Sequence, residues 1–378
     1  MALDAAWRGA VAELRAEVRS FLAEERERGG YRPMVDGWVQ GVDPEFSRRL
    51  ASRGWVGMVV PREYGGAGST ALRRWVVTDE LLAAGAPVAA HWIGDRQVAP
   101  SLLRHGTEEQ RRKFLPGIAS AELIFCLGMS EPDAGSDLAA VRTRAERHPD
   151  GRWVLNGTKL WTSHAQVAGA ILLLARSSPL GERRHVGLSQ FLVELPRDGV
   201  SIRPIQTIDG KAHFNEVVFD DVALPEDALL GTEGEGWRQV TMELAYERSG
   251  PERISSSVPL LLAWGDSLRA EDQSAREEYA ALIARLVMLR RMSVEIAAEL
   301  EEGSVPETRA AMVKALGGEF EQRVVESVSR FFGAVPSFSG TELETQLAHG
   351  LTHAPTFGVR GGATDILLGI VAKSVGAR

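Results

Sequence analysis

Apolar residues change their spacing twice along this chain, and that change constrains the fold more than any other feature of the sequence. Helical spacing dominates up to about residue 121, short apolar runs typical of strands follow, and helical spacing returns after about residue 234. The strand-rich part shows no strand–helix alternation, which argues against a Rossmann-type fold. We therefore predict an α+β protein with an N-terminal all-α domain (1–121), a central antiparallel β-barrel or sandwich (122–234) and a C-terminal four-helix bundle (235–378).

Capping signals locate two helices in the first part of the chain. Asp43 is a helix N-cap residue followed by proline at the first helical position, and Gly54 closes that helix. Thr107 and Gln110 form a capping box at the start of a second helix. Between these helices, residues 61–69 are too rich in glycine for a regular element, so we expect a loop there.

Turn residues separate the expected strands of the central part. The Asn156-Gly157 pair favours a type I′ turn and lies between apolar runs at 153–155 and 158–163, so we predict a two-stranded hairpin. Further strands are expected at 170–175, 188–195, 200–208 and 216–219. In the last part, helices are expected at 237–247, 275–301, 307–332 and 365–375.

Composition and charge exclude several classes of protein. The 378 residues are 44% hydrophobic and 25% charged, which is ordinary for a globular chain. A net charge of −8 argues against nucleic acid as the main partner. The single cysteine, Cys126, leaves no internal disulfide and no cysteine-based zinc site. His349 and His353 have metal-ligand spacing, but no carboxylate ligand accompanies them, so we expect two surface histidines and no metal.

No segment predicts a membrane anchor. The longest uncharged apolar run, 167–175, is too short to cross a bilayer. Asp4, Glu13 and Glu17 lie among apolar residues at the start of the chain, which favours an amphipathic helix over a signal peptide. We therefore expect a cytoplasmic protein with no membrane partner.

Five segments match a known family in order and spacing. They are GWVGMVVPREYGGAG (54–68), HGTEEQRRKFLPGIASAELIFCLGMSEPDAGSD (105–137), WVLNGTKLWTSHA (153–165), FNEVVFDDVALP (214–225) and LGTEGEGWRQVTMELAYER (230–248). Together they resemble the acyl-CoA dehydrogenase family. The resemblance implies an FAD flavoprotein of lipid metabolism that oxidises an acyl-CoA thioester to the 2-enoyl-CoA. It also implies an electron-transfer flavoprotein or similar acceptor, and a homo- or hetero-oligomer (a dimer or tetramer).

The resemblance assigns roles to residues of two segments. Leu127, Met129 and Ser130 occupy positions at which the family lines the flavin ring with backbone amides and a hydroxyl group. Ser136 occupies a position that faces the pantetheine part of CoA. The local alternative for this segment is a β-turn with an aspartate cap.

Trp161 and Ser163 are expected on one face of a strand, because side chains two residues apart along a strand point the same way. The resemblance implies that Trp161 places its indole beside the flavin ring and that Ser163 places its hydroxyl group near the reactive nitrogen. The alternative is that Trp161 is a core residue, as tryptophans on strands usually are.

The catalytic base is the residue on which the resemblance is most informative. Removal of a weakly acidic α-proton requires a carboxylate near Cα. Many family members carry that glutamate in a C-terminal segment like Tyr-Glu-Gly-Thr, and here Gly361 stands at its position. The isovaleryl and long-chain types carry it before an arginine on the helix after Gly-Trp, and the count from Gly236-Trp237 places Glu247-Arg248 there. We predict Glu247 as the base and Arg248 as a substrate-orienting residue.

Two alternatives are open for this assignment. Glu247 could be one acid of a solvated, charged helix face that also includes Glu252 and Arg253. Asp365 lies four residues beyond Gly361, about 5–6 Å away on a helix, which is too far to replace the carboxylate without a rearranged backbone. We expect Asp365 to cap the start of a helix instead.

Two family motifs are absent from the predicted bundle. Arg-x-x-Phe-Gly, which holds the FAD pyrophosphate and adenine across a subunit interface, should lie near Gln273, where the sequence reads AEDQSAREEYAAL. Gln-x-x-Gly-Gly is replaced by RFFGA at 330–334. The flavin-ring half of the site is therefore present and the adenine half is not. A partner subunit of different sequence, weaker FAD binding, or activity in only some of the assembly's sites would each account for this.

Three functions are compatible with the sequence. We predict an FAD-dependent acyl-CoA dehydrogenase that acts on a branched or bulky acyl group, because a base on this helix often accompanies such substrates in the family. A flavin oxidase or monooxygenase of the same family, in which reduced flavin reacts with oxygen, would show similar motifs. A degenerate subunit that stabilises an active partner would account for the lost adenine motifs.

Overall fold

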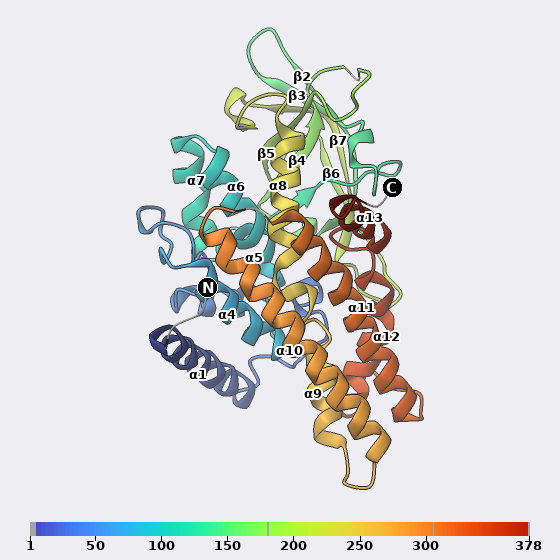
Figure 1. Cartoon of the computed structure of the whole chain (residues 1–378). Helices are drawn as coiled ribbons and strands as arrows, with labels where there is room; N and C mark the ends of the chain where they lie inside the picture. Colours follow the sequence, from blue (N-terminus) through green and yellow to red (C-terminus); the bar gives the residue numbers. More distant parts are fainter. Residues whose placement is uncertain (1–4, 180, 305, 377–378) are drawn as a thin grey trace. The chain divides into compact units, whose positions relative to one another are not determined.

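Two compact units make up the chain (Figure 1). The computed structural model describes residues 5–179, 181–304 and 306–376, and the side chains of 5–8 and 244–247 lie outside that description. Unit 1 takes its described residues from Met1–Phe46, Ser69–Ala89 and Ala245–Arg378, and unit 2 from Ser47–Gly68 and Ala90–Leu244. Each unit combines segments that are distant in the sequence, so the units do not correspond to three continuous domains. The predicted domain boundaries at residues 121 and 234 therefore stay a prediction.

Unit 1 is helical. Its elements are α1 (Ala5–Glu27), α2 (Gly37–Gln40), α4 (Ala71–Ala83), the end of α8 (Gly236–Ser249), η6 (Pro251–Arg253), α9 (Val258–Ser267), α10 (Gln273–Glu301), α11 (Glu307–Phe332), α12 (Glu342–Phe357) and α13 (Thr364–Ser374). Apolar residues of α9, α10, α11 and α12 form its main core. The bounds of α10, α11 and α13 agree closely with the predicted helices, whereas α9 and α12 were not predicted.

Unit 2 contains short helices that the capping signals locate correctly. Its helical elements, with α3 starting in unit 1 and α8 ending there, are α3 (Pro44–Ser52), η1 (Arg62–Tyr64), α5 (Ala89–Ile93), the π-helix η2 (Gly94–Val98), α6 (Ala99–His105), α7 (Glu108–Ala119), η3 (Leu138–Ala140), η4 (Ala165–Val167), η5 (Glu226–Ala228) and the start of α8. Asp43 Oδ1 accepts a hydrogen bond from Phe46 N at 2.8 Å at the start of α3. Thr107 and Gln110 make both bonds of the predicted capping box. These signals succeed because each involves residues only a few positions apart.

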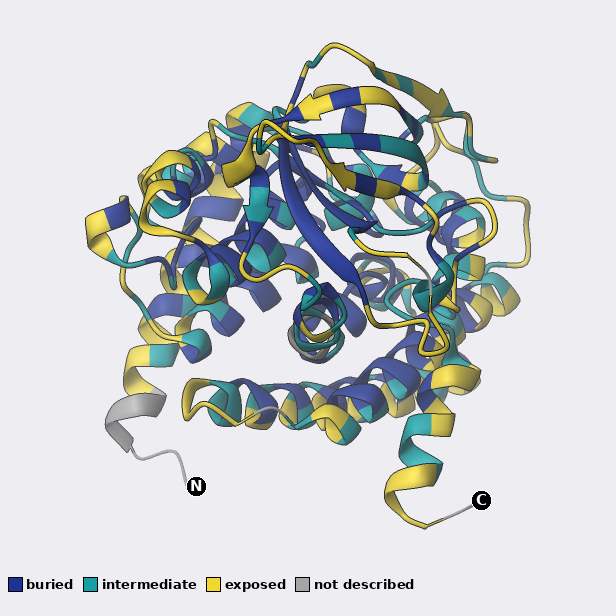
Figure 2. Cartoon of the chain, turned by 90° about the horizontal axis from the view of Figure 1, so that it is seen from above, coloured by how far each residue is buried: buried dark blue, intermediate teal, exposed yellow. Residues whose placement is uncertain are grey.

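The other part of unit 2 is one mixed sheet. Its strands are β1 (Phe125–Gly128), β2 (Arg144–Arg147), β3 (Trp153–Ser163), β4 (Ala170–Arg176), β5 (Leu188–Glu194), β6 (Val200–Ile205), β7 (Phe214–Leu224) and β8 (Leu229–Leu230). The order is β6-β7-β3-β2-β4-β5-β8, and β1 pairs with β4. The β1–β4 and β2–β4 pairs are parallel. The sheet does not close into a barrel, since its described strand order ends at β6 and β8. Strand β4 is buried along its whole length, and buried segments are dark blue in Figure 2.

The predicted hairpin at Asn156-Gly157 is wrong, because β3 runs continuously through both residues. The register against β7 shifts at this point, and Gly157 has φ +148°. A Cβ on Gly157 would lie 2.5 Å from Thr143 Oγ1, so the glycine allows a close approach of the chain instead of a turn. The Asn156 side chain accepts from Asp221 N and donates to Asp221 Oδ1, both at 2.9 Å, and so bridges the irregular register.

Two residues singled out by the sequence are buried. Cys126 lies in β1, and burial raises the pKa of its thiol. His353 is not a surface residue: it is 4% exposed, and its Nδ1 lies 3.1 Å from Asp36 Oδ2. Within the described residues there is no group of three or more His, Cys, Asp or Glu that could hold a metal ion. The described helices include none that is long and apolar enough to cross a membrane.

Candidate functional site

Two segments of unit 2 that carry the predicted cofactor residues lie side by side. Leu160 N donates to Ser130 O at 2.9 Å, and Lys159 Nζ donates to Met129 O at 3.0 Å. The end of β1 is thereby fixed against the end of β3, which is some thirty residues further along the chain. The predicted cofactor residues on these segments are partly or fully accessible: Leu127, Met129, Ser130, Trp161 and Ser163.

Trp161 lies at an irregular point of β3. Its φ is +62°, and the register against β7 shifts between Lys159 and Thr162. The regular alternation that would place Trp161 and Ser163 on one face is therefore interrupted. The Trp161 side chain is 52% exposed, and its ring meets Phe214 edge-on with centroids 5.8 Å apart. Such exposure contradicts the alternative that Trp161 is a core residue.

A buried ion pair holds these two segments together. Glu131 Oε1 accepts from Lys159 Nζ at 2.8 Å and from Thr143 N at 2.9 Å, and Glu131 Oε2 accepts from Arg142 N at 2.6 Å. The side chains of Lys159 and Glu131 are 0% and 7% exposed. Burial alone would raise the pKa of Glu131, but Lys159 and these donors hold that pKa below its usual range. Burial lowers the pKa of Lys159 to about 8.

This pair was not predicted from the sequence. Lys159 is buried because the regular alternation of β3 puts it on the same inward face as Trp153 and Leu155. The signal in the sequence was Lys159 itself, a charged residue within a strand of apolar residues. A lysine that is buried requires a charged partner, so its position indicates a buried ion pair.

The segment after Glu131 forms the turn that the local alternative expected. Glu131 and Ala134 exchange backbone hydrogen bonds of 2.9 and 3.1 Å. Gly135 and Ser136 follow on the surface, and a Cβ built on Gly135 would meet nothing within 4 Å. The turn and the proposed ligand contact are compatible, because the turn leaves Ser136 accessible.

A cavity of about 410 Å³ lies in unit 2 between segments 140–146 and 176–184. Its charged lining residues are Arg142, Arg144, Glu146, Arg176 and Arg184. Arg176 is used structurally, since its guanidinium donates to the backbone carbonyl groups of four other residues. Arg184 Nη1 donates to Asp137 Oδ2 at 2.5 Å, one residue beyond Ser136. The lining therefore has an excess of positive charge, which suits an anionic ligand.

The predicted base lies on the last turn of α8. Glu247 belongs to this helix, but its side chain is outside the described part of the structure. Arg248, the next residue, donates from Nε to Gly361 O at 3.1 Å. Gly361 has φ +68°, a conformation that favours glycine. The residue after the predicted base thus contacts the segment in which many family members carry that base.

The two alternatives for the base have different outcomes. Glu252 and Arg253 are each 1% exposed in η6, which contradicts a solvated charged face that includes them. Asp365 is exposed in the first turn of α13, and the N-cap position itself is Ala363. A carboxylate in a first helical turn interacts favourably with the helix dipole, which explains Asp365 without a catalytic role.

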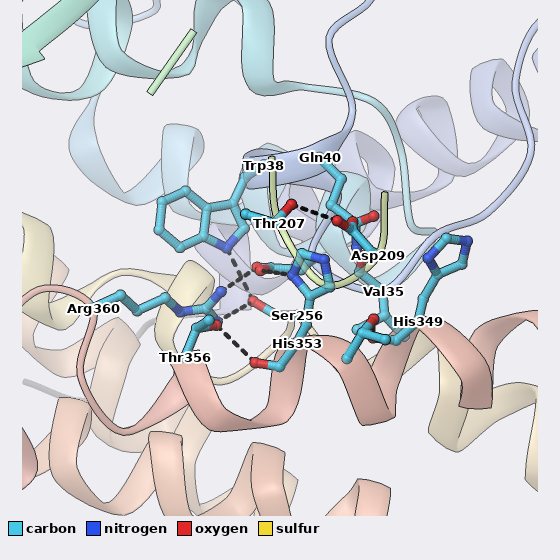
Figure 3. A network of polar contacts seen from close by, with 12 residues as sticks. Val35, Trp38, Gln40, Thr207, Asp209, Ser256, His349, His353, Thr356 and Arg360 are labelled. Atoms are coloured by element: carbon cyan, nitrogen blue, oxygen red, sulfur yellow. Dashed lines mark hydrogen bonds and ion pairs between the residues drawn. The ribbon is translucent and has the colours of Figure 1, made fainter. Parts of the chain in front are cut away.

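A buried network surrounds Arg360, the residue before Gly361. Its guanidinium donates to Asp36 Oδ1, to Ser256 Oγ at 2.8 Å and to Glu321 Oε2 at 2.9 Å. It lies 4.8 Å from the ring centroid of Trp38, whose indole N–H donates to Ser256 Oγ (Figure 3). Sequence reasoning missed this network, because its members come from four distant places in the chain.

The network fixes the charges of its carboxyl groups. Burial would raise the pKa of Asp36, but Arg360 and His353 lower it to about 2. Burial raises the pKa of Glu321, and Arg360 opposes that rise. Arg360 is therefore held between an aspartate whose pKa is lowered and a glutamate whose pKa is raised.

The region expected to hold the adenine of FAD has other contacts. Gln273 begins α10 and donates to Glu277 Oε1 at 2.9 Å. Phe331, in the replaced motif, stacks on Trp264 with centroids 5.7 Å apart. Both Gln273 and Phe331 are nevertheless exposed, so these contacts bury neither side chain.

Comparison with known proteins decides the family. Family models described as acyl-CoA dehydrogenase N-terminal, middle and C-terminal domains match residues 10–122, 126–222 and 263–376. A solved structure described as "Tcur3481-Tcur3483 steroid ACAD" is 30% identical, covers 98% of both chains and has a TM-score of 0.86. The chain belongs to the acyl-CoA dehydrogenase family. Members of this family are FAD-binding flavoproteins that act on the CH–CH bond of acyl-CoA.

Two other members of the family show similar sequence or structure. The acyl-CoA dehydrogenase IpdE1 of Mycobacterium tuberculosis is 40% identical over 245 residues, which are 63% of this chain and 63% of IpdE1. The ChsE4-ChsE5 complex from Mycobacterium tuberculosis is 28% identical, covers 97% of this chain and 96% of the matched chain, and has a TM-score of 0.82. Because the match spans less than two thirds of IpdE1, the likeness to IpdE1 supports the family assignment but does not establish a specific activity.

Proposed function

We propose that this chain is a subunit of an FAD-dependent acyl-CoA dehydrogenase that converts an acyl-CoA to the 2-enoyl-CoA. The observation that carries this proposal is the pairing of the segment at 127–131 with the end of β3, which gathers the residues assigned to the flavin ring. FAD, when bound, supplies the acceptor for the β-hydride, which no side chain can accept.

The residues in this region fit a flavin ring. An accessible indole at Trp161 offers an apolar flat surface, and Leu127 and Met129 offer further apolar contact. The hydroxyl groups of Ser130 and Ser163 are suited to hydrogen bonding with the polar edge of the ring. We propose that these five residues hold the ring and that the Glu131–Lys159 pair keeps their two segments in register.

We propose Glu247 as the base that removes the α-proton. A carboxylate placed among apolar groups becomes a stronger base when substrate excludes water from it. Gly361 cannot perform this step because it has no side chain. Arg248, which lies next to Glu247 and contacts Gly361 O, would orient the substrate through charge-assisted hydrogen bonds.

The substrate is proposed to be a bulky acyl-CoA. Ser136 would contact the pantetheine, and the arginine-lined cavity beside Asp137 would hold phosphate groups of CoA. A bulky acyl group, including one attached to a steroid ring system, is supported by the steroid ACAD that matches 98% of this chain.

The partner is proposed to be a related subunit of different sequence. The motifs that hold the adenine half of FAD are absent here, and the two structural relatives described above are named as pairs of proteins. In such a heteromer the partner supplies the missing contacts, and an electron-transfer flavoprotein or similar protein receives the electrons.

Anaerobic titration with a panel of acyl-CoA thioesters tests the proposed function. The chain is purified alone and after co-expression with a candidate partner, and flavin absorbance is followed. We expect a yellow co-expressed complex that is bleached by a bulky acyl-CoA and less so by butyryl-CoA. If air rapidly re-oxidises the reduced flavin and peroxide is released, the protein is an oxidase and not a dehydrogenase. A complex that holds flavin but is bleached by no acyl-CoA would contradict the proposal.

The assignment of the base has its own test. Glu247→Gln should keep FAD and substrate binding but lose exchange of the α-proton with solvent, by at least about 10²-fold. Glu235→Gln is the matched control, because Glu235 is a partly exposed acid just before the same helix and pairs with Arg238 at 2.6 Å. Exchange that survives in Glu247→Gln at the control's rate places the base elsewhere.

A further inference from the structure

The last turn of α8 is held from two sides within unit 1. On one side Arg248 Nε donates to Gly361 O at 3.1 Å. On the other, Ser249 O accepts from Ser293 Oγ at 2.5 Å, and Ser293 Oγ accepts from the indole N–H of Trp75 at 2.8 Å. Carbonyl groups at the end of a helix have no partner within the helix, and Ser293 supplies one for Ser249 O; together with the Arg248 contact it helps to hold the turn in place.

The Ser293 contact restricts rotation of the turn only through a short lever arm. It reaches a backbone oxygen of Ser249, and the helix backbone lies only about 2.3 Å from the helix axis. The Arg248 contact acts through a long side chain on the surface of the helix, and so a shift of its acceptor changes the rotation of the turn. The position of the Gly361 carbonyl group is therefore the sensitive point.

Close packing places the Gly361 carbonyl group. Gly361 and Gly362 have φ values of +68° and +113°. A Cβ on Gly361 would lie 2.7 Å from Arg253 Nη2, and a Cβ on Gly362 would lie 3.3 Å from Arg248 Nη2. The backbone of these two glycines is thus enclosed by two arginine side chains, and it has no room for the carboxylate that many relatives carry here.

Arg360 anchors the same segment from the other end. Its guanidinium is bound to Asp36, Ser256 and Glu321, and its centre lies 4.6 Å from the ring centroid of Phe357. The side chain is only 13% exposed. A planar group with several fixed donors and two flanking rings allows little movement of the residue that carries it. The Gly361 carbonyl group lies one peptide further along the chain, and the close packing of Gly361 against Arg253 and of Gly362 against Arg248 limits the rotations that separate it from Arg360.

We infer that Arg360 is a positioning residue for the base: it fixes the Gly361 carbonyl group, which holds Arg248 and so sets the rotation of the α8 turn that carries Glu247. This inference rests on the proposed function. It explains why a segment that has lost the base has kept a rigid, glycine-dependent backbone. A purely structural role for Arg360 predicts a loss of stability without a specific change at the end of α8.

The first test measures the end of α8 directly and needs no activity. Arg360→Lys keeps the charge between Asp36 and Glu321 but loses the fixed set of donors. We expect amide hydrogen exchange in peptides covering 245–250 to become at least tenfold faster. Arg323→Lys is the matched control, because Arg323 pairs with Glu278 at 2.9 Å between α11 and α10 of the same unit. Equal exchange in Arg360→Lys and the control would overturn the inference.

The second test uses the reaction. With a substrate that wild type oxidises, Arg360→Lys should lower kcat and α-proton exchange by the same factor, about 10–100-fold, with KM and flavin content unchanged. The double variant Arg248→Lys/Arg360→Lys should be no slower than the slower single variant, because both act through one contact. Additive losses would overturn the inference. A wild-type complex without α-proton exchange would refute the proposed function, and the hydrogen-exchange test would still decide the positioning role.

Discussion

Each unit contains a buried cation that fixes the backbone around it, but the two units distribute the contacts of that cation differently. In unit 2, Lys159 faces one carboxylate, Glu131, and one carbonyl group. In unit 1, Arg360 faces two carboxylates, a hydroxyl group and two aromatic rings. Lys159 therefore has one carboxylate to balance its charge, whereas the charge of Arg360 is balanced by two carboxylates and is also contacted by a hydroxyl group and two rings.

This difference predicts how each unit responds to the loss of one member. A buried charge that loses its only counterion keeps its full desolvation cost. A charge that loses one of several partners is still partly compensated. Unit 2 should therefore be the more sensitive to a single substitution, although its ion pair has fewer contacts to lose.

The largest effect is expected from Lys159→Met. This change leaves Glu131 buried without its cation and should lower the free energy of unfolding by about 3–5 kcal/mol. Urea unfolding followed by circular dichroism measures the loss, and flavin content should fall with it. The control is Lys113→Met, which removes an exposed ion pair with Glu194 and should cost about 0–1 kcal/mol.

The double variant Glu131→Gln/Lys159→Met shows whether the unpaired charge is the cause. Without the carboxylate there is no buried charge to penalise, so the double variant should be more stable than Lys159→Met alone. A double variant that is less stable than Lys159→Met would contradict this account. It would indicate that the backbone hydrogen bonds to Glu131 matter more than its charge.

A smaller, pH-dependent effect is expected from Asp36→Asn in unit 1. The pKa of Asp36 is about 2, below its usual 3.8, so the ionised form stabilises the folded state above about pH 4. That contribution, about 2 kcal/mol, is lost as the pH falls through 2. The difference in unfolding free energy between wild type and Asp36→Asn should therefore shrink as the pH falls below 4.

Urea unfolding across this pH range tests the sign. Glu342→Gln serves as the control, because it alters an exposed ion pair with Arg26 in the same unit. Its difference from wild type should stay small throughout. A difference for Asp36→Asn that grows toward acid pH would show that burial, and not Arg360, dominates the titration of this aspartate.

Local signals in the sequence predicted parts of both units. The caps at Asp43 and Thr107 and the long helices α10 and α11 agree with the structure, because their patterns involve neighbouring residues. The missed helix α12 starts with a capping box at Thr341 and Glu344, so its signal was present in the sequence. The hairpin failed for the opposite reason: Gly157 matches a turn, but its close approach to Thr143 is visible only in three dimensions.

The hydrogen bonds of His353 and Arg360 could not be predicted from local patterns in the sequence. His353 was expected on the surface because nothing near it in sequence pairs with it, and its partner Asp36 lies more than three hundred residues away. Arg360 is bound by residues from α11 and from the segments around positions 36 and 256. A single sequence shows the residue types that such a network needs, but not which of them meet.

The smallest effects are expected from alanine substitutions in two loops, 131–137 in unit 2 and 358–362 in unit 1. They compare how tightly the two loops are packed. Gly361→Ala should lower the unfolding free energy by about 1–2 kcal/mol, since φ is +68° and the new Cβ would meet Arg253. Gly135→Ala should change it by less than about 0.5 kcal/mol, because nothing lies within 4 Å of its Cβ. Thermal unfolding of both variants measures the contrast. Equal losses would mean that the loop at 358–362 is no more tightly packed than the surface turn, and that the Gly361 carbonyl group has no fixed place from which to hold α8.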